Sequence, residues 1–297
     1  MPEKRRIPVV LDTDIGGDID DTWALAMMLK SPELDVKLIT SGTGNTRYRA
    51  AIIARLLEVA GRIDIPVGIG VMRDPAGSGP QQPWVEKYDI SRFPGIVHTD
   101  GVRALIDTIL KSPEEITLIG IGPATNIAAA LDAEPGIARK CRFVGMFGSI
   151  RRHHEGADGA IAEYNVAHDI PACQKVFTAG WKSMVITPMD TCGMVRLKGN
   201  LYAAVYNCPD PLIRAVIENY RIWLQGKPEQ EQSSILFDTV AIYLAFTQEL
   251  LVMEKMGLRV TDEGFTVRDP NGPSVGVAMD WKDLAQYEEF LVGRLTG

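Results

Sequence analysis

Residues 9–21 are Val9-Val10-Leu11-Asp12-Thr13-Asp14-Ile15-Gly16-Gly17-Asp18-Ile19-Asp20-Asp21, and they place five carboxylates within ten residues, directly after an apolar run. The continuous apolar residues 9–11 are typical of a buried parallel strand, and residues 22–29 are typical of a helix that begins after the last two aspartates. The acidic turn therefore lies where a strand ends and its helix begins, which is the ligand edge of an open α/β sheet. Gly16 and Gly17 allow a tight turn that points several side chains inward.

This density of negative charge requires a cation. One aspartate alone could cap the following helix or lie in a solvated loop. Five carboxylates, spaced Asp-x-Asp and then Asp-x-Asp-Asp beside a buried strand, favour a metal site instead. Because no His or Cys lies nearby, the ligand chemistry indicates calcium or magnesium rather than zinc.

Composition excludes several classes of protein. The chain has 297 residues, 46% of them hydrophobic, which argues for an ordered globular protein. A net charge of -7 and a pI near 5.2 argue against a nucleic-acid surface, and the only basic cluster is at residues 151–154. No run approaches the roughly 18 apolar residues of a membrane span, and the charged residues 1–6 do not lead into a secretory segment. We therefore expect a cytoplasmic protein without a membrane partner.

The four cysteines form no Cys-x-x-Cys pair, and in a reducing compartment they are expected to be free thiols.

Predicted strands alternate with predicted helices as far as residue 187. After the first unit, strands are expected at 35–40, 65–69, 116–121, 141–146 and 184–187, and helices at 47–60, 101–110, 127–131 (capped by Thr125) and 170–179. Further helices are expected at 201–224, 238–246 and 281–295, and strands at 257–260, 265–268 and 275–278. This order predicts an α/β fold, with one mostly parallel, Rossmann-like open sheet and helices on both faces, as a single domain over residues 1–297. Residues 71–100 lack periodicity and are expected to form a long loop that acts as a lid.

Six short motifs follow one another along these predicted elements. They are Asp12-Thr13-Asp14 with Gly16 and then Asp20-Asp21; Gly44-Asn45; Ile119–Asn126 (Ile-Gly-Ile-Gly-Pro-Ala-Thr-Asn); Met146 with Gly148; Glu163-Tyr164-Asn165; and Asp238 at the start of a late helix. In this order the chain resembles the inosine-uridine-preferring nucleoside hydrolases over essentially its whole length. The resemblance implies calcium-dependent hydrolysis of the N-glycosidic bond of a ribonucleoside to ribose and free base, by a homodimer or homotetramer.

The resemblance also implies roles for individual residues. Calcium ligands would be Asp14, Asp21, the backbone carbonyl of Ile121, and Asp238, which also borders the substrate. Asp14 would take the proton from a water molecule. Asp20 would be the second catalytic carboxylate and would bind the 2′-hydroxyl, and Asp12 would support the turn. Asn45, Glu163 and Asn165 would hold the other ribose hydroxyls, with Met146 under the sugar. Glu163 and Asn165, two apart in an extended segment, would point to the same side.

Simpler structural roles remain open for the same residues. Asp238 could only cap its helix, and Asn45 could be a turn residue. Glu163 and Asn165 could face solvent, and Met146 could be core packing.

The chain departs from the family pattern in two places. The Asp20-Asp21 pair lies two residues later than usual, so Asp18 could take over a ligand position. Phe237 stands where the inosine-uridine branch has a His that protonates the departing base. The replacements available in the sequence are His153, His154 and His98, or stacking of the base on Trp84, Phe93 or Trp223. The leaving group could also need no acid, or the substrate could be an uncommon nucleoside.

Two other functions compete with hydrolysis of a nucleoside. Phe237 motivates a non-catalytic, calcium-dependent nucleoside- or ribose-binding protein. Residues 11–14 resemble the nucleophile motif of haloacid dehalogenase-like phosphohydrolases, although Gly16 replaces the expected Thr or Val and that family does not explain residues 163–165 or Asp238. The sequence leaves the base preference open, since the base would contact loops 71–100 and 149–162 and the helix near residue 223.

Overall fold

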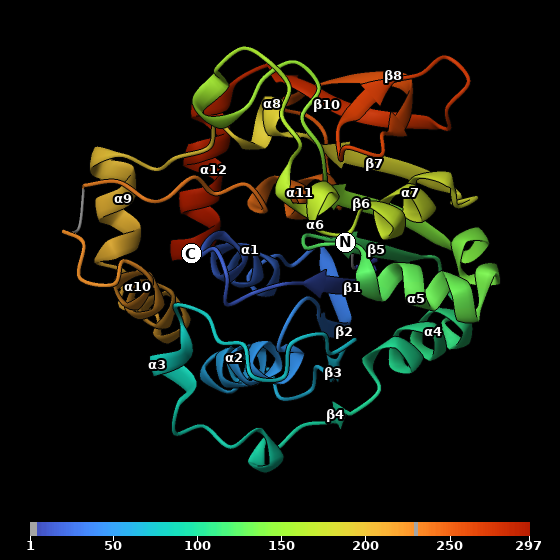
Figure 1. Ribbon diagram of the computed structural model, residues 1–297. Coiled ribbons are helices and arrows are strands. Elements are labelled where there is room, and N and C mark those ends of the chain that lie inside the picture. The colour runs from blue at the N-terminus through green and yellow to red at the C-terminus, as the bar shows by residue number, and fades with distance from the viewer. Residues whose placement is uncertain (1–4, 229–230) are drawn as a thin grey trace.

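The computed structural model describes residues 5–228 and 231–297, and within them one ten-stranded sheet runs through the molecule (Figure 1). Its order is β4-β3-β2-β1-β5-β6-β7-β10-β8-β9. The strands from β4 to β10 are parallel, and β8 and β9 continue the sheet in antiparallel fashion. Their bounds are β1 Ile7–Thr13, β2 Leu34–Ser41, β3 Val67–Ile69, β4 Val97–His98, β5 Ile116–Gly120, β6 Cys141–Met146, β7 Ser183–Thr187, β8 Leu251–Val260, β9 Thr266–Arg268 and β10 Ser274–Trp281.

Both faces of this sheet are buried under helices. On β1, Val9 and Leu11 belong to one apolar core and Val10 to another, as the two-residue period of a strand requires. The first core is completed by α1 (Asp20–Leu29), α2 (Thr46–Val59), α10 (Pro211–Trp223), α11 (Thr239–Leu244) and α12 (Leu284–Thr296). The second is covered by α4 (Gly101–Lys111), α5 (Thr125–Ala133) and α7 (Ile170–Thr178), as Figure 1 shows. The predicted fold class is confirmed.

The strand order places a ligand site beside β1. From β1 the chain adds β2, β3 and β4 on one side, and then returns to add β5, β6 and β7 on the other. In such a sheet a crevice forms outside the carboxyl ends of the strands where the direction reverses, here between β1 and β5. The acidic turn follows β1, and Ile121 follows β5, so both lie at this crevice.

The acidic turn is held in place by α2. Gly16 has φ of 103°, and a Cβ there would lie 2.8 Å from Ile52 Cδ1 and 2.9 Å from Tyr48 Cε1. The Tyr48 hydroxyl donates a hydrogen bond to the carbonyl of Gly16 (3.0 Å), and the Arg49 guanidinium donates to the carbonyl of Ile15 (3.0 Å). Only glycine combines this backbone conformation with so close an approach.

Several predicted elements are wrong in detail. The helix expected over 201–224 is two helices, α9 (Gly199–Tyr206) and α10, because Asp210 caps a new helix whose first residue is Pro211. Residues 71–100 are not all loop: they contain the short helix α3 (Gln82–Val85), a 3-10 turn at Ile90–Arg92 and the edge strand β4. The last helix begins at Leu284 rather than 281, after its cap.

Thr125 is the first residue of α5 rather than its cap, and its hydroxyl donates a hydrogen bond to Asp169 instead.

All four cysteines are buried free thiols, as predicted. Within residues 5–228 and 231–297, no helix combines the length and the apolarity needed to span a bilayer.

Candidate active site

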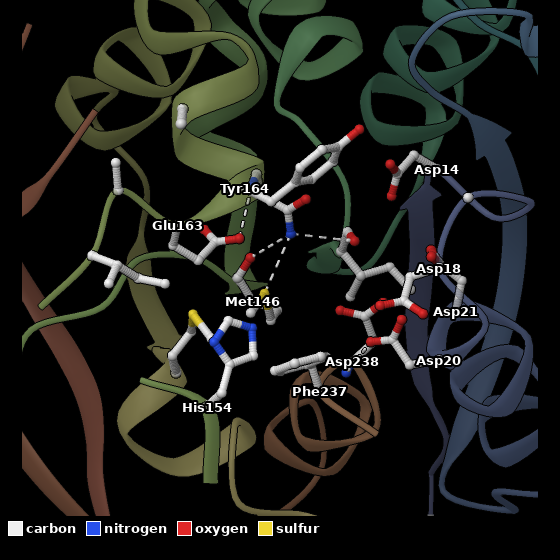
Figure 2. Close-up of a pocket in the computed structure, with 17 residues that line it drawn as sticks. Asp14, Asp18, Asp20, Asp21, Met146, His154, Glu163, Tyr164, Phe237 and Asp238 are labelled. Carbon is white, nitrogen blue, oxygen red and sulfur yellow. Dashed lines mark hydrogen bonds between the residues drawn. The ribbon is translucent and has the colours of Figure 1, made fainter. Parts of the chain in front are cut away.

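A cavity of about 610 Å³ opens at the carboxyl ends of β1, β5 and β6. The acidic turn, Ile121 and Met146 form part of its wall, and Phe237 and Asp238 form another part just before α11. Residues 161–165 and Ala167, in the loop and the short helix α6 (Tyr164–His168), form a further part. Figure 2 shows these segments, distant in sequence, pointing their side chains into one space. The predicted site residues from the acidic turn, β5, β6 and α11 therefore meet.

Three carboxylates form the densest charge in the cavity. Asp20, Asp21 and Asp238 are buried, and each offers an oxygen within 4.8 Å of the others (Figure 2). Burial raises the pKa of all three well above the usual range, and the neighbouring carboxylates raise it further. Asp20 accepts a hydrogen bond from the backbone N–H of Asp238 (3.2 Å), and Asp21 accepts one from the Thr13 hydroxyl.

These groups fit a hard divalent cation. Buried carboxylates that repel one another are stable only when protonated or paired with positive charge. All the donors are oxygens, which suits calcium or magnesium and gives no preference for a softer metal.

Asp14 and Ile121 lie in the same cavity but outside this cluster of three. Asp14 is buried, which raises its pKa. Gly122 passes directly beside it: a Cβ on Gly122 would lie 2.8 Å from Asp14 Oδ1 and 2.9 Å from its backbone nitrogen. The carbonyl of Ile121 accepts a hydrogen bond from the Asn165 amide (3.4 Å) and is turned towards the cavity wall that α6 provides.

Asp12 does not line the cavity, and its carboxylate ties neighbouring elements together behind it. It accepts hydrogen bonds from Asn126 Nδ2 (2.8 Å) and the Thr40 hydroxyl (2.5 Å). Burial is the largest influence on this carboxyl and raises its pKa to about 6. The contacts join β1, β2 and α5, and so fix the strand that carries Asp14.

Glu163 and Asn165 reach the cavity by a different geometry from the one predicted. The segment is not extended: Glu163 caps α6, accepting hydrogen bonds from the N–H groups of Asn165 (2.7 Å) and Val166 (3.3 Å), and also from Gly148 (2.9 Å). Burial raises the pKa of Glu163 to about 7. Asn165 donates to the carbonyl of Met146 (3.0 Å). Both side chains are buried in the cavity wall and do not face solvent.

Asn45 lies outside this cavity, and Asp18 lies at it but apart from the cluster of three. Asn45 lines an adjoining cavity of about 280 Å³, which shares Tyr164 with the first. It caps α2 by accepting from the N–H of Tyr48 (3.0 Å), and it donates to the carbonyl of Gly77 (2.9 Å), so it has the turn role that was left open. Asp18 is exposed at the cavity, outside the cluster of three, and accepts from the N–H of Ile19 (2.7 Å).

Among the candidates for contact with the departing base, His154 is the one that lines the cavity. Its ring meets that of Phe237 edge to face, with centroids 5.8 Å apart. His153 packs against His154 without lining the cavity. The other candidates lie away from it: His98 is in the edge strand β4, Trp84 donates to Glu218 under the Arg55 guanidinium, Trp223 stacks on Tyr220, and Phe93 belongs to the core beside α2.

The structure adds a residue that the sequence did not single out. Asp190, in the short helix α8 (Met189–Cys192), is fully buried and accepts hydrogen bonds from the N–H groups of Ile150 (2.8 Å), Arg151 (2.9 Å) and Arg152 (3.3 Å). It thereby anchors the loop that leads to His154. Asp190 could have been found from the sequence, because it follows the end of β7 by three residues, just as the acidic turn follows the end of another parallel strand.

Comparison with known proteins decides the family. The family model described as "Inosine-uridine preferring nucleoside hydrolase" matches residues 9–288. The chain belongs to this family. Membership makes this nucleoside hydrolase an N-glycosyl hydrolase of ribonucleosides, as the sequence predicted, and excludes the phosphohydrolase alternative.

Similar proteins agree with this assignment. A "Non-specific ribonucleoside hydrolase RihC" from Escherichia coli O1:K1 / APEC is 30% identical, over 96% of this chain and 97% of its own. A "Pyrimidine-specific ribonucleoside hydrolase RihA" from Citrobacter koseri is 34% identical, but over 59% of this chain and 57% of its own. Among solved structures, the "Plant nucleoside hydrolase - PpNRh1 enzyme" superposes with a TM-score of 0.84 at 24% identity, covering 99% of this chain and 100% of that one. That likeness shows a shared fold.

Gly122→Ala is expected to displace the Asp14 carboxylate, because the new Cβ would lie 2.8 Å from its Oδ1. Given the catalytic role that the family resemblance implies for Asp14, kcat should fall by about 10²-fold. The measurement is steady-state release of reducing sugar from a nucleoside, together with the melting temperature. Gly180→Ala is the matched control, since no atom lies within 4 Å of a Cβ there. Equal kcat for the two variants would contradict the expected crowding of Asp14.

Proposed function

We propose that this hydrolase is calcium-dependent, and that the ion is held by Asp14, Asp21, Asp238 and the backbone carbonyl of Ile121. The observation that supports this most directly is the cluster of buried carboxylates within 4.8 Å of one another, which contains Asp21 and Asp238 together with Asp20. Asp14 and Ile121 line the same cavity. Calcium bound there would lower the pKa of a coordinated water and hold two ribose hydroxyls.

Residues of the cavity activate the water, bind the ribose and stabilise the developing charge. Asp14 takes the proton from the attacking water. Asp20, beside the ion, accepts a hydrogen bond from the 2′-hydroxyl, and Glu163 and Asn165 hold the other end of the ribose above Met146. The acidic wall stabilises the positive charge that develops on the sugar ring as the glycosidic bond lengthens.

A panel of ribonucleosides tests this function. Purified protein is incubated with each nucleoside, with and without a calcium chelator, and reducing ribose is measured. We expect ribose from at least one nucleoside and none in the chelator. Absence of ribose from every nucleoside would contradict the function, and tight nucleoside binding without release of base would identify a non-catalytic binder instead.

Assembly and location are further parts of this proposal. The family resemblance favours a homodimer or homotetramer, which light scattering on the purified protein tests directly. The four buried free thiols are compatible with a reducing, cytoplasmic environment.

A further inference from the structure

We propose that His154 protonates the departing base, the role that the residue at position 237 has in the inosine-uridine branch and that Phe237 cannot perform. The inference rests on the proposed function of the same cavity. It assigns a catalytic residue for the departure of the base, whereas the acidic turn and the proposed calcium ligands act on the water and the sugar.

The first observation is the position of the imidazole. His154 lines the cavity, and its ring is in edge-to-face contact with the Phe237 ring. Because the two rings touch, His154 approaches the same part of the cavity that a side chain at position 237 would serve. Figure 2 shows His154 and Asp14 on opposite sides of the space, with Met146 between them. A nucleoside whose sugar lies at the carboxylates would therefore direct its base towards His154.

The second observation is that the loop around His154 is fixed. Asp190 accepts hydrogen bonds from three consecutive N–H groups at residues 150–152. On the other side of His154, the N–H of Glu155 donates to the carbonyl of Gly193 (2.8 Å), and the Glu155 carboxylate pairs with Arg196 (3.1 Å). A catalytic group must keep its orientation through the reaction, and these contacts supply that orientation from the α8 side of the cavity.

The surroundings of His154 leave its ring accessible from the cavity and from solvent. Asp18 lines the same cavity as His154. His153 meets the His154 ring edge to face at 5.9 Å, and the neighbouring Glu155 is neutralised by Arg196. Phe237 covers one side with an apolar ring. The side chain is exposed, so it can regain a proton from solvent after each turnover.

In the proposed step the bond between C1′ and the base nitrogen breaks, and its electron pair moves onto the base. The base takes the proton of the His154 imidazolium, while the water oxygen bonds to C1′ and its proton goes to Asp14. The products are neutral base and ribose, and the proton held by Asp14 returns to His154 through solvent.

The test compares leaving groups. His154→Gln is assayed with inosine and uridine, whose bases need protonation, and with p-nitrophenyl β-D-ribofuranoside, whose phenolate departs without it. We expect kcat on the nucleosides to fall by about 10²-fold and kcat on the p-nitrophenyl riboside to change by less than about 3-fold. His153→Gln is the matched control, because that residue precedes His154 but does not line the cavity, and it should leave all rates near wild type.

Equal losses on both kinds of substrate, or no loss on the nucleosides, would overturn the assignment. The double variant His154→Gln, Phe237→His provides a second readout: a His at 237 should restore nucleoside hydrolysis at least about 10-fold over His154→Gln alone, and a double variant that stays at the lower rate would refute the equivalence of the two positions. Wild-type protein that hydrolyses neither nucleosides nor the p-nitrophenyl riboside would instead refute the proposed function.

Discussion

Replacing Asp14 by asparagine is expected to lower kcat for ribonucleoside hydrolysis by about 10³-fold or more, since the variant loses both a general base and a charged ligand for the ion. The buried amide has nearly the same shape, so the fold should persist. Asp14 lies beside Gly122 in the wall of the cavity that holds the closest carboxylate cluster, so it is placed to reach both the ion and a water molecule next to it. Steady-state assays of ribose release, with melting temperatures to confirm folding, measure this effect.

Asp18→Asn is the comparison that makes the Asp14 result informative. Asp18 lies in the same turn but is exposed and outside the cluster, so solvent screens its charge and its loss should cost no more than about 10-fold in kcat. A larger loss from Asp18→Asn than from Asp14→Asn would mean that Asp18 has taken over the role, which the shifted spacing of the acidic turn left open.

Removal of calcium is expected to abolish turnover and also to destabilise the protein. A ligand that binds only the folded state contributes about 2.7 kcal/mol at 100 times its dissociation constant, so the melting temperature in chelator should fall by several degrees. Added calcium should restore both properties, and a parallel titration with magnesium distinguishes the two cations. Full activity in excess chelator would contradict a calcium-dependent mechanism.

The pH dependence of the metal-free protein provides a control on that interpretation. Asp20, Asp21 and Asp238 have pKa values raised by burial, so the folded state holds their protons more tightly than the unfolded state does. Their contribution is therefore most favourable below the ordinary aspartate pKa and is lost as pH rises through the raised values. In chelator, the melting temperature should fall as pH rises from 5 towards 8, and Asp238→Asn should weaken this trend.

The sequence predicted the parts of the molecule that depend on local patterns. The apolar run at residues 9–11 and the alternation of strands with helices determined the class of sheet, and the carboxylates after β1 identified its ligand edge. Asp21 and Asp238 are 217 positions apart, and it was the family resemblance, rather than any local pattern, that joined them before the structure did.

Other parts depend on contacts between segments that no local pattern encodes. Glu163 and Asn165 were assigned to an extended segment, but the Glu163 side chain accepts three backbone N–H groups and starts a helix. Asn45 follows a strand end as expected. Its side-chain amide, however, donates hydrogen bonds to carbonyls of the loop at 75–77, and it lines a neighbouring cavity. The sequence offered six candidates for contact with the base. Only the packing of His154 on Phe237, which the structure shows, singles out one of them.

Asp190 and α8 hold the loop of His154, whereas α2 holds the turn of Asp14, so the two halves of the reaction are built on separate pieces of scaffold. Substitutions in residues 149–162 at positions other than His154 are then expected to change contacts with the base while the carboxylates at the sugar stay in place. Such a division would let one hydrolytic centre serve purines in one descendant and pyrimidines in another, by exchange of a single surface loop.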